Sequence, residues 1–355
     1  MSDSAKRLVV IAPWLQGGGA QAAMFESVRR AAYSPTLLVV LFNGNRDFDG
    51  ARELFDEVLF LGNPKSPLGV LKAARQLKRM LEPSDRVYSL MRGSHVVLGL
   101  LPSPRLRKLE LLASFHQSPD EDARSATGRI ENIPVRRLMK HARLVTAPSQ
   151  RAIDELRAAR VLGPEQGVRS SNPIRSAAGA PVRRRRDADD PVRLLLAGRL
   201  DDQKGISDLE GLLEQISHPV ELLVAGDGPL RDEVNRLSTN LWRHTVSPLG
   251  YQSNIFDRID EIDYIFLPSR FELNPVIIWE GWSRGRPAIG SDIEAFNDLK
   301  TSGPIHIFSD PADLDLLISR LARRTDSDFD GAIRAAGAEE SSQVLVRSLR
   351  GGQQL

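Results

Sequence analysis

Short apolar runs rich in Val, Ile and Leu alternate along the whole chain with longer segments of helical periodicity. Runs of this kind are typical of buried strands, and the segments between them place apolar residues on one helical face. The alternation predicts parallel sheets covered by helices. The predicted strands are 8–12, 37–42, 57–61, 86–90, 109–115, 144–147, 193–197, 221–225, 263–267, 288–290 and 305–308.

The chain of 355 residues is longer than the roughly 250 to 300 residues at which a single core stops growing, so two domains are expected. Residues 176–190 mix small residues, proline and charge blocks without an apolar period, as a linker does. The prediction is an N-terminal domain over 1–175 and a C-terminal domain over 191–330.

Composition narrows the class of protein. An apolar content of 41% is enough for two cores, and the absence of cysteine excludes disulfides, zinc-thiolate sites and a cysteine nucleophile. No run approaches the ~18 apolar residues of a membrane-spanning helix. The first seven residues lack the apolar segment of a signal peptide. We therefore expect a soluble, cytoplasmic protein.

The formal net charge of +2 hides an asymmetry. Residues 1–175 carry a net charge of +10 and the remainder −8, and basic residues gather at 72–79 and 136–143. An anionic partner such as the inner face of a membrane fits this half, although solvated helix faces explain the same pattern. The arginine run at 183–186 lacks interleaved aromatic residues, so nucleic acid is not expected as a partner.

Two glutamates, Glu272 and Glu280, follow the predicted strand 263–267 with seven residues between them. Pro275 favours a helix start between the two, because proline is tolerated in the first helical turn. Glu272 would then lie in a loop at the end of a sheet, with Glu280 on the helix beside it. Each carboxylate could hold a hydroxyl-rich group. The alternative is that both are solvated surface charges, since such spacing also arises by chance.

Two cations flank a predicted turn in the same half of the chain. Arg199 directly follows the predicted strand 193–197, and Lys204 precedes a helical segment. Both can converge on one phosphate group and stabilise the charge of a departing diphosphate. The next predicted strand, 221–225, ends in a tight turn at Gly226.

Gly17, Gly18 and Gly19 connect the first predicted strand to an Ala-rich helical segment. Bare backbone at a helix N-terminus allows an anion to approach closely. A tight turn without a ligand is an equally good interpretation, because neither G-x-G-x-x-G nor a P-loop signature is present.

Several short motifs occur in a fixed order from residue 8 to about residue 300, and together they resemble the retaining GT-B glycosyltransferases of the group often called family 4. The order and spacing are more specific than any one motif. The motifs are Gly17-Gly18-Gly19, Phe115-His116, Ala147-Pro148-Ser149, Ser171-Asn172-Pro173-Ile174, Gly198-Arg199-Leu200 with Lys204-Gly205, Gly226-Asp227-Gly228-Pro229, Leu249-Gly250-Tyr251, Pro268-Ser269, the Glu272 and Glu280 pair, and Gly285-Arg286-Pro287.

The resemblance implies an α/β fold of the GT-B type, with two doubly wound, Rossmann-like parallel-sheet domains facing a central cleft. It assigns the acceptor to the N-terminal domain and the sugar-nucleotide donor to the C-terminal domain. It also implies that residues 331–355 form a helix or tail that packs back on the N-terminal domain. It also implies that Arg199 and Lys204 bind the donor diphosphate, that Glu272 contacts the transferred sugar, and that Glu280 holds the ribose hydroxyls. His116 is expected near the sugar and the incoming acceptor.

Further positions are implied to bind substrate: Gly17, Gly18 and Gly19 near phosphate or acceptor, Gly226, Tyr251 near the base, and the loop residues Asn274, Pro275 and Val276. That loop departs from the glycine-rich segment usual in the family. Pro275 has no N–H to offer a phosphate, and Asn274 is expected to adopt the left-handed conformation in place of glycine.

The implied activity is metal-independent, retaining transfer of a hexose-like sugar from a nucleoside diphosphate to a glycan or lipid-linked acceptor, in polysaccharide or envelope biosynthesis. No cofactor and no metal are expected, since neither Asp47-Phe48-Asp49 nor Asp313-Leu314-Asp315 ends a predicted strand facing the cleft. Two alternatives remain open at this point. One is a sugar-nucleotide epimerase or phosphorylase on the same fold, and the other is a catalytically silent domain that binds a glycan or a protein partner.

Overall fold

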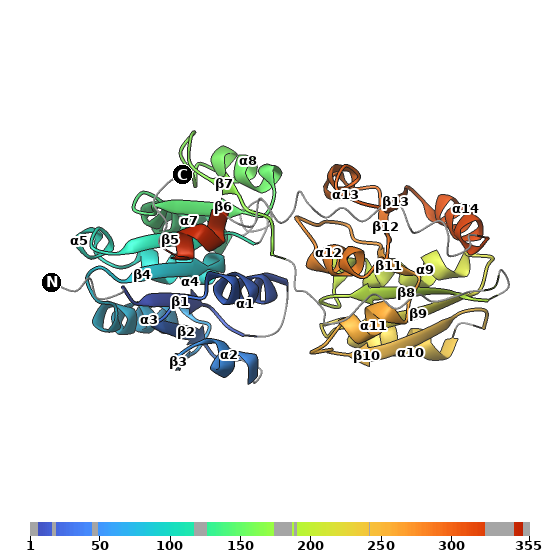
Figure 1. The fold of residues 1–355 in the computed structure, drawn as a ribbon, viewed down its shortest axis with the longest axis horizontal. Helices are drawn as coiled ribbons and strands as arrows, with labels where there is room; N and C mark the ends of the chain where they lie inside the picture. The colour runs from blue at the N-terminus through green and yellow to red at the C-terminus, as the bar shows by residue number, and fades with distance from the viewer. Residues whose placement is uncertain are drawn as a thin grey trace. The chain divides into compact units, whose positions relative to one another are not determined.

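The structure is a computed structural model, and it describes residues 6–15, 19–44, 49–116, 126–173, 187, 190–240, 242–323 and 344–350. The chain divides into two compact units. The upstream unit comprises residues 1–173 and 339–355, and the downstream unit comprises residues 174–338. Each unit is built around a sheet covered by helices, shown in Figure 1.

Among the described residues of the upstream unit, seven strands form one parallel sheet in the order β3-β2-β1-β4-β5-β6-β7. Its strands are β1 (Leu8–Ala12), β2 (Thr36–Phe42), β3 (Glu57–Asn63), β4 (Arg86–Leu90), β5 (Glu110–Ser114), β6 (Leu144–Ala147) and β7 (Val168–Arg169). The helices are α1 (Gly19–Ala31), α2 (Asp49–Leu54), α3 (Pro67–Met80), α4 (Met91–Gly99), α5 (Ser103–Leu106), α7 (Ala126–Met139) and α8 (Gln150–Ala158).

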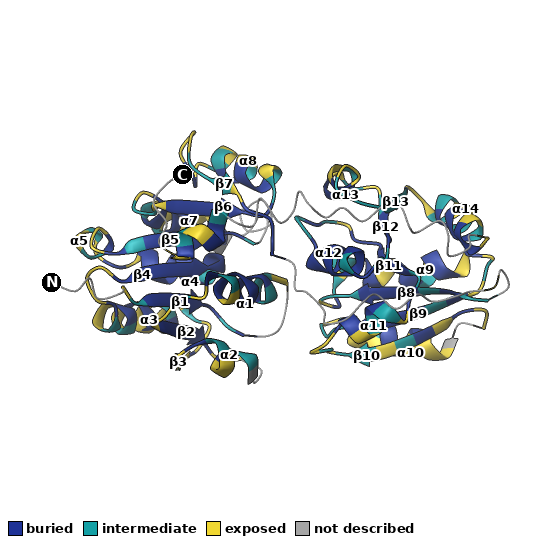
Figure 2. Cartoon of the chain, viewed as in Figure 1, coloured by how far each residue is buried: buried dark blue, intermediate teal, exposed yellow. Residues whose placement is uncertain are grey.

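The apolar runs of β1, β2 and β4 are buried along their whole length, as Figure 2 shows in dark blue. A strand covered by helices on both faces has no polar side, which explains why these sequences read as continuous apolar runs. Ser66 caps α3 by accepting a hydrogen bond from the Gly69 amide at 3.2 Å, and Pro67 occupies the first turn.

A helix over residues 344–350 belongs to the upstream unit, and its apolar side chains Leu345, Val346 and Leu349 are buried in that unit's core. The carbonyl of Leu349 accepts a hydrogen bond of 2.9 Å from Nη1 of Arg86, the first residue of β4. The Arg350 side chain donates to the carbonyl of Ala31 at 3.1 Å.

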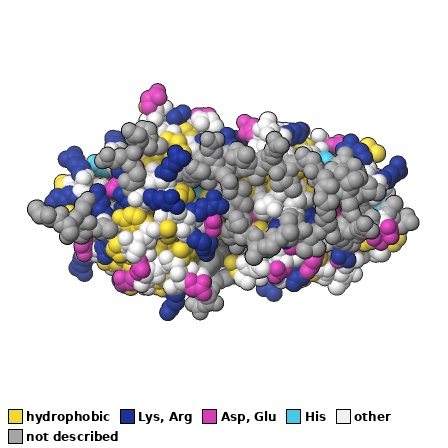
Figure 3. Space-filling model, viewed as in Figure 1, with side chains coloured by type: hydrophobic (Ala, Val, Ile, Leu, Met, Phe, Trp, Pro, Cys, Tyr) yellow, Lys and Arg dark blue, Asp and Glu magenta, His cyan; other side chains and the backbone are white. Residues whose placement is uncertain are grey.

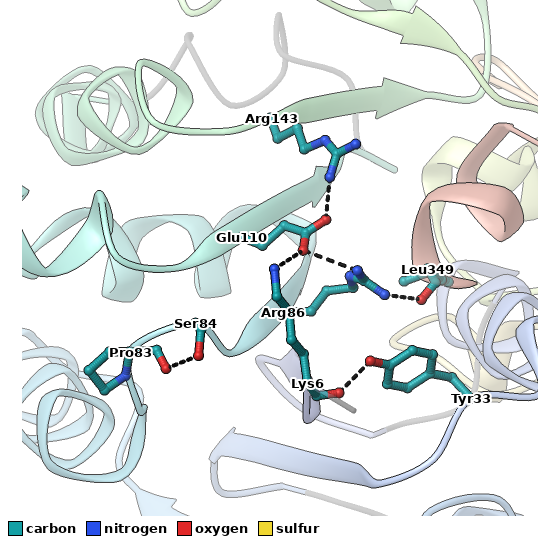
Figure 4. Close-up of polar contacts among 8 residues, drawn as sticks. All are labelled: Lys6, Tyr33, Pro83, Ser84, Arg86, Glu110, Arg143 and Leu349. Carbon is teal, nitrogen blue, oxygen red and sulfur yellow. Dashed lines mark hydrogen bonds and ion pairs between the residues drawn. The ribbon is translucent and has the colours of Figure 1, made fainter. Parts of the chain in front are cut away.

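The same Arg86 takes part in a network at the amino edge of the sheet, shown in Figure 4. Glu110, at the start of β5, accepts from Arg86 at 3.0 Å, from Arg143 at 2.6 Å and from Lys6 at 3.3 Å. One carboxylate thus joins side chains that lie at or just before the starts of several strands, on the edge opposite the carboxyl ends.

In the part of the downstream unit that the structure describes, six strands form a second parallel sheet in the order β10-β9-β8-β11-β12-β13. The strands are β8 (Val192–Ala197), β9 (Val220–Ala225), β10 (Thr245–Gly250), β11 (Tyr264–Leu267), β12 (Ala288–Ser291) and β13 (Ile305–Phe308). The helical segments are η1 (Asp202–Lys204), η2 (Ile206–Asp208), α9 (Leu209–Glu214), α10 (Arg231–Asn240), α11 (Phe256–Asp260), α12 (Val276–Ser283), α13 (Glu294–Leu299) and α14 (Pro311–Ala322).

Each of the eleven predicted strands is present, four with the predicted bounds and the others with bounds shifted by one or two residues. Two strands escaped sequence analysis, β7 and β10. β7 has two residues, and β10 contains Ser247 and Pro248, so neither shows a continuous apolar run. β10 pairs with β9 alone, and an edge strand tolerates proline because one side of its backbone needs no ladder partner. In the described residues no helix is both long and apolar enough to cross a membrane.

Candidate functional site

The predicted donor-binding residues of the downstream unit gather on loops at one edge of its sheet. β9, β8 and β11 are neighbours in the parallel order, so the loops that follow their carboxyl ends lie side by side. These loops carry Gly226, Arg199 with Lys204, and Glu272 respectively. Ligands of open α/β sheets bind at this edge.

Close backbone packing fixes the loops after β8 and β9. The Gly198 amide donates to the carbonyl of Ala225 at 3.0 Å, and the Gly226 amide donates to that of Gly250 at 2.8 Å. Gly226 has φ +148°, and a Cβ there would lie 1.8 Å from the Gly198 carbonyl oxygen. Only glycine fits this position, so Gly226 shapes the loop edge through its missing side chain.

The loop after β8 is also locked to the loop after β11. Asp201 accepts from the Lys204 amide at 3.3 Å and so caps η1, which holds Lys204 at the end of a single helical turn. Gly205 follows at φ +70°, where a Cβ would lie 2.0 Å from the Pro268 carbonyl oxygen. The Arg270 amide donates to the carbonyl of Gln203 at 2.9 Å.

Lys204 and Glu272 meet across these two loops. The Lys204 ammonium forms an ion pair with Oε1 of Glu272, and the Ser269 hydroxyl donates to the same oxygen at 3.0 Å. The Glu272 and Lys204 side chains are 6% and 14% exposed. A buried carboxylate is retained where it is paired and hydrogen-bonded, as Glu272 is. The interpretation of Glu272 as a solvated loop charge is therefore wrong.

Arg199 lies on the same loop as Lys204 but in a different environment. Its side chain is 65% exposed, and its Nε pairs with Oδ2 of Asp201 at 3.1 Å. The Asp201 carboxylate therefore contacts both the Arg199 side chain and the Lys204 backbone. The two residues predicted to bind phosphate lie on one short segment. Arg199 is exposed to solvent, whereas Lys204 is largely buried in its ion pair with Glu272.

Glu280 lies in α12, whose N-cap is Pro275 and whose first residue is Val276. The side chain of Glu280 is buried, so the alternative of a solvated helix charge is wrong here as well. The indole of Trp279 donates a hydrogen bond to the Asn274 side-chain oxygen. The backbone of Asn274 does not have a positive φ, so the prediction that it adopts the left-handed conformation is wrong. The Asn274 side chain accepts this bond from Trp279, and a glycine at position 274 would have no side chain to accept it.

The other residues that were predicted to bind substrate lie outside the Lys204 and Glu272 loops. Tyr251 directly follows β10 and is partly exposed. Gly19 is the exposed first residue of α1, whereas Gly17 and Gly18 lie outside the described residues.

His116 belongs to the upstream unit and follows the carboxyl end of β5. Its Nε2 lies 2.8 Å from the Ser114 hydroxyl oxygen. Its Nδ1 is buried without a hydrogen-bond partner among the described residues. Burial lowers the pKa of His116 to about 4, so the imidazole is neutral at pH 7.

Two residues of the downstream site were given no role by sequence analysis, Asp201 and Ser269. A signal for Asp201 existed, because an aspartate three residues before Lys204 has the spacing of a helix cap. Ser269 belongs to the Pro268-Ser269 motif of the family resemblance, but nothing in the sequence indicated that its hydroxyl donates to Glu272.

In the part of the chain that the structure describes, no group of three or more His, Cys, Asp or Glu side chains is placed to hold a metal ion. Asp313 accepts from the Ser309 amide at 3.0 Å, and Asp315 accepts from the Ser217 amide at 2.7 Å. These two carboxylates satisfy backbone groups. Asp47 lies outside the described residues, and Asp49 begins α2.

Solved structures share this architecture. The crystal structure of Anabaena Alr3699/HepE in complex with UDP and glucose matches with a TM-score of 0.71 at 17% sequence identity, over 98% of this chain and 97% of that one. WaaG, a glycosyltransferase involved in lipopolysaccharide biosynthesis, matches with a TM-score of 0.64 at 13% identity, over 97% of each chain. Two parallel-sheet α/β units with these neighbours define the GT-B fold, as expected.

Comparison of the amino-acid sequence with known proteins points to one family of the GT-B fold. Residues 191–324 match the family model described as glycosyl transferases group 1. The chain is 26% identical over 267 residues to an alpha-D-kanosaminyltransferase of Streptomyces kanamyceticus, covering 69% of each protein. It is 27% identical over 170 residues to the lipopolysaccharide core biosynthesis glycosyltransferase LpsD of Rhizobium meliloti (strain 1021), covering 47% of this chain and 48% of that one. These findings support a GT-B glycosyltransferase of group 1.

Proposed function

We propose that this glycosyltransferase transfers a hexose-like sugar from a nucleoside diphosphate to a hydroxyl of a glycan or glycolipid, with retention of the anomeric configuration. The observation that carries the proposal is the Lys204–Glu272 pair, held by Ser269 at the carboxyl edge of the downstream sheet with Arg199 above it. The site offers cations for a diphosphate and a carboxylate for a sugar within one loop cluster.

The proposed chemistry follows from these groups. An incoming diphosphate competes with Glu272 for the Lys204 ammonium and gains a second, mobile cation in Arg199. Glu272 is then free to accept hydrogen bonds from sugar hydroxyls. Cations aimed at the departing diphosphate stabilise charge that grows as the glycosidic bond breaks. Fixed side-chain cations can therefore supply the role that a divalent ion has in other transferases.

Roles for the other predicted residues complete the proposal. Glu280 binds the ribose hydroxyls, and Tyr251 lies beside the base. His116, at the carboxyl edge of the upstream sheet, is that unit's contribution to the binding of the sugar or the acceptor. Gly226 and the loop residues Asn274, Pro275 and Val276 are proposed to line the donor.

Relatives support the choice of substrates. The named relatives include an aminosugar transferase and a lipopolysaccharide core transferase, and one structural neighbour was solved with UDP and glucose. UDP beside glucose in one neighbour supports a sugar nucleotide as donor, and lipopolysaccharide core biosynthesis in one relative supports a glycan or lipid-linked glycan as acceptor. Polysaccharide or envelope biosynthesis is the setting that we propose.

The first experiment is a thermal-shift screen of the full chain against UDP-, GDP- and ADP-sugars, because a ligand that binds only the folded state raises Tm. The hit is then incubated with an acceptor glycan, and both the released nucleoside diphosphate and the anomeric configuration of the product are measured. We expect a Tm rise that Lys204→Met removes. Stabilisation by every nucleotide without sugar transfer would favour a silent binding domain, and interconversion of donor sugars without an acceptor would favour an epimerase.

We also propose that the upstream unit contacts an anionic membrane surface. In α3 the side chains of Lys72, Arg75, Lys78 and Arg79 are exposed, and the helix contains no acidic residue. Leu68, on the same helix, is 78% exposed. Figure 3 shows Lys and Arg side chains beside hydrophobic ones on the visible face of this unit. Exposed aliphatic side chains flanked by basic ones suit the boundary between lipid headgroups and acyl chains.

Liposome sedimentation tests the membrane proposal. Binding should rise with the fraction of anionic lipid, fall with salt, and weaken in the double variant Lys72→Glu/Arg75→Glu. The matched control is Arg236→Glu on α10 of the acidic downstream unit, which should bind as the wild type does. Sedimentation that is independent of anionic lipid would reject the proposal.

A further inference from the structure

The loop that carries Glu272 is held to the rest of the downstream unit by side chains on both sides of that glutamate. Before it, the side-chain amide of Gln203 donates a hydrogen bond to the carbonyl of Phe271 at 3.1 Å. After it, the indole N–H of Trp279 donates to the side-chain oxygen of Asn274. Glu272 therefore lies between two anchors, and neither of them uses its carboxylate.

Trp279 is a rigid anchor because it belongs to the core of the downstream unit. Its side chain is buried in the apolar cluster that also contains Ile265 and Leu267 of β11. Its ring meets that of Trp282 edge to face, with the centroids 4.9 Å apart and the planes at 80°. Side chains packed in a dense core occupy one rotamer, so the indole N–H points in a fixed direction.

The helix that bears this anchor is itself fixed to the sheet. A Cβ on Gly281 would lie 2.5 Å from Cγ1 of Ile265, so α12 approaches β11 more closely than a side chain at position 281 allows. The indole N–H of Trp282 donates to the carbonyl of Pro304, the residue before β13, at 2.9 Å. Through Trp279 the loop therefore takes its position from the sheet.

The bond from Trp279 also crosses a weak point of the loop. Pro275 has no N–H, and it is the N-cap of α12, where none of the described side chains makes a capping hydrogen bond. The indole can only donate, so the acceptor must be the side-chain oxygen of Asn274. This bond joins the residue before the proline to the helix after it.

The anchors become important when a donor binds. In the free protein Lys204 and Ser269 hold the carboxylate of Glu272. Under the proposed function the donor diphosphate takes the Lys204 ammonium, and Glu272 loses that cation at the moment when it must hold the sugar. The hydrogen bonds from the Gln203 and Trp279 side chains do not involve the ammonium, so they can keep the loop in place.

We propose that Trp279 is a positioning residue for Glu272: through Asn274, its indole N–H fixes the loop that directs the carboxylate to the transferred sugar. The effect on the sugar rests on the proposed function, whereas the coupling between Trp279 and Asn274 does not. Loss of this hydrogen bond should therefore affect recognition of the sugar and leave recognition of the nucleotide unchanged.

A double-mutant cycle in the free, full-length protein tests the anchor. Trp279→Phe keeps an aromatic ring and removes the N–H, and Asn274→Ala removes the acceptor. Packing lost in Trp279→Phe is lost with either residue at position 274, so it cancels in the cycle. We expect the unfolding equilibrium constant of the double variant, measured with urea, to change by about two- to tenfold less than the product of the single effects. A change equal to that product would overturn the proposal.

Trp282→Phe is the matched control. The two tryptophans lie on the same helix, their side chains are 2% and 1% exposed, and each donates one hydrogen bond through its indole. The bond from Trp282 goes to Pro304 and not to the loop, so the effects of Trp282→Phe and Asn274→Ala should combine as a simple product. Coupling of the same size in this control cycle would also overturn the proposal.

Binding measurements distinguish positioning from a general loss of structure. Isothermal titration calorimetry compares the best ligand among UDP-, GDP- and ADP-glucose with its nucleoside diphosphate. Trp279→Phe and Asn274→Ala should each weaken binding of the sugar nucleotide and lower kcat about five- to tenfold, as expected for one lost hydrogen bond. The Kd of the nucleoside diphosphate should stay unchanged, and Trp282→Phe should change neither Kd. Equal losses for both ligands would show a merely structural role.

The outcomes separate this proposal from the proposed function. If the wild type binds no sugar nucleotide, the proposed function fails, and the unfolding cycle still decides whether Trp279 anchors the loop. If transfer proceeds and the cycle shows no coupling, the role of Trp279 fails and the function stands. If Trp279→Phe does not fold, Asn274→Ala alone decides through the two Kd values, because it removes the same hydrogen bond from the half-buried loop side.

Discussion

Lys204 and Glu272 are 68 residues apart in the chain and form an ion pair at the carboxyl edge of the downstream sheet. Each belongs to a loop that follows its own strand, and β8 and β11 are direct neighbours. The pair thus joins the cation and the carboxylate expected to hold opposite ends of a sugar diphosphate. In the free protein the two charges neutralise each other. Under the proposed function, Lys204 exchanges Glu272 for the donor diphosphate when the donor binds.

Glu272→Ala should abolish transfer, because no other group at the Lys204 loop is proposed to hold the sugar. It should also lower the free energy of unfolding by about 1–3 kcal/mol, since it leaves the largely buried Lys204 without its carboxylate. Activity is therefore compared at matched folded fractions, measured by circular dichroism. Glu272→Gln, which keeps the shape without the charge, separates the two effects. Near-normal turnover in either variant would remove Glu272 from the proposed mechanism.

Arg199→Ala should weaken donor binding by at least about 1.5 kcal/mol, the lower range for a hydrogen bond to a charged group. Stability should change little, because an exposed ion pair contributes about 0–1 kcal/mol. Isothermal titration calorimetry measures the donor Kd. Arg236→Ala, which breaks a comparable exposed pair with Glu210, is the control and should leave Kd unchanged. Equal donor affinity in Arg199→Ala and the wild type would show that Arg199 does not contact phosphate.

Gly226→Ala should destabilise the downstream unit strongly. Its positive φ alone costs about 1–3 kcal/mol for a residue with a side chain, and the new Cβ would overlap the Gly198 carbonyl oxygen. The matched control is Gly211→Ala in α9, where a Cβ meets nothing within 4 Å. That change should be neutral or stabilise the helix by about 0.5–1 kcal/mol. Urea unfolding of both variants checks the prediction, and equal midpoints would contradict it.

Stability should fall as the pH drops below 6.5. Burial lowers the pKa of His95 to about 3 and that of His116 to about 4, whereas the unfolded chain has ordinary values near 6.5. The unfolded state therefore binds protons first, and the free energy of unfolding is highest above pH 6.5. The free energy of unfolding then decreases by about 1.4 kcal/mol per pH unit for each histidine as the pH falls toward 4.

Urea titrations at pH 7, 6 and 5 measure this slope in a range above most carboxylate titrations. His116→Gln should reduce the slope by the contribution of one proton. A free energy of unfolding that stays constant from pH 7 to 5 would show that the two imidazoles are not buried in neutral form.

Much of the fold is readable in the sequence because a strand covered on both faces must be apolar throughout. β1 and β4 have the bounds expected from their apolar runs. β10 is not readable, because an edge strand needs only one partner and can contain Ser247 and Pro248. The three apolar residues in 344–350 do not by themselves indicate which core they enter, and the expectation for this tail came from the family resemblance alone.

The sequence by itself determined the two-unit α/β plan, the resemblance to group 1 glycosyltransferases, and the positions of the cations and carboxylates, since these follow from local composition and motif order. Only the tertiary structure decided how those groups pair. The Lys204–Glu272 contact, the Asp201 bridge and the Ser114–His116 hydrogen bond depend on strand order and on loop backbones that approach closely. The physical reason is that an ion pair or hydrogen bond is fixed by distances of a few ångströms, which chain separation does not encode.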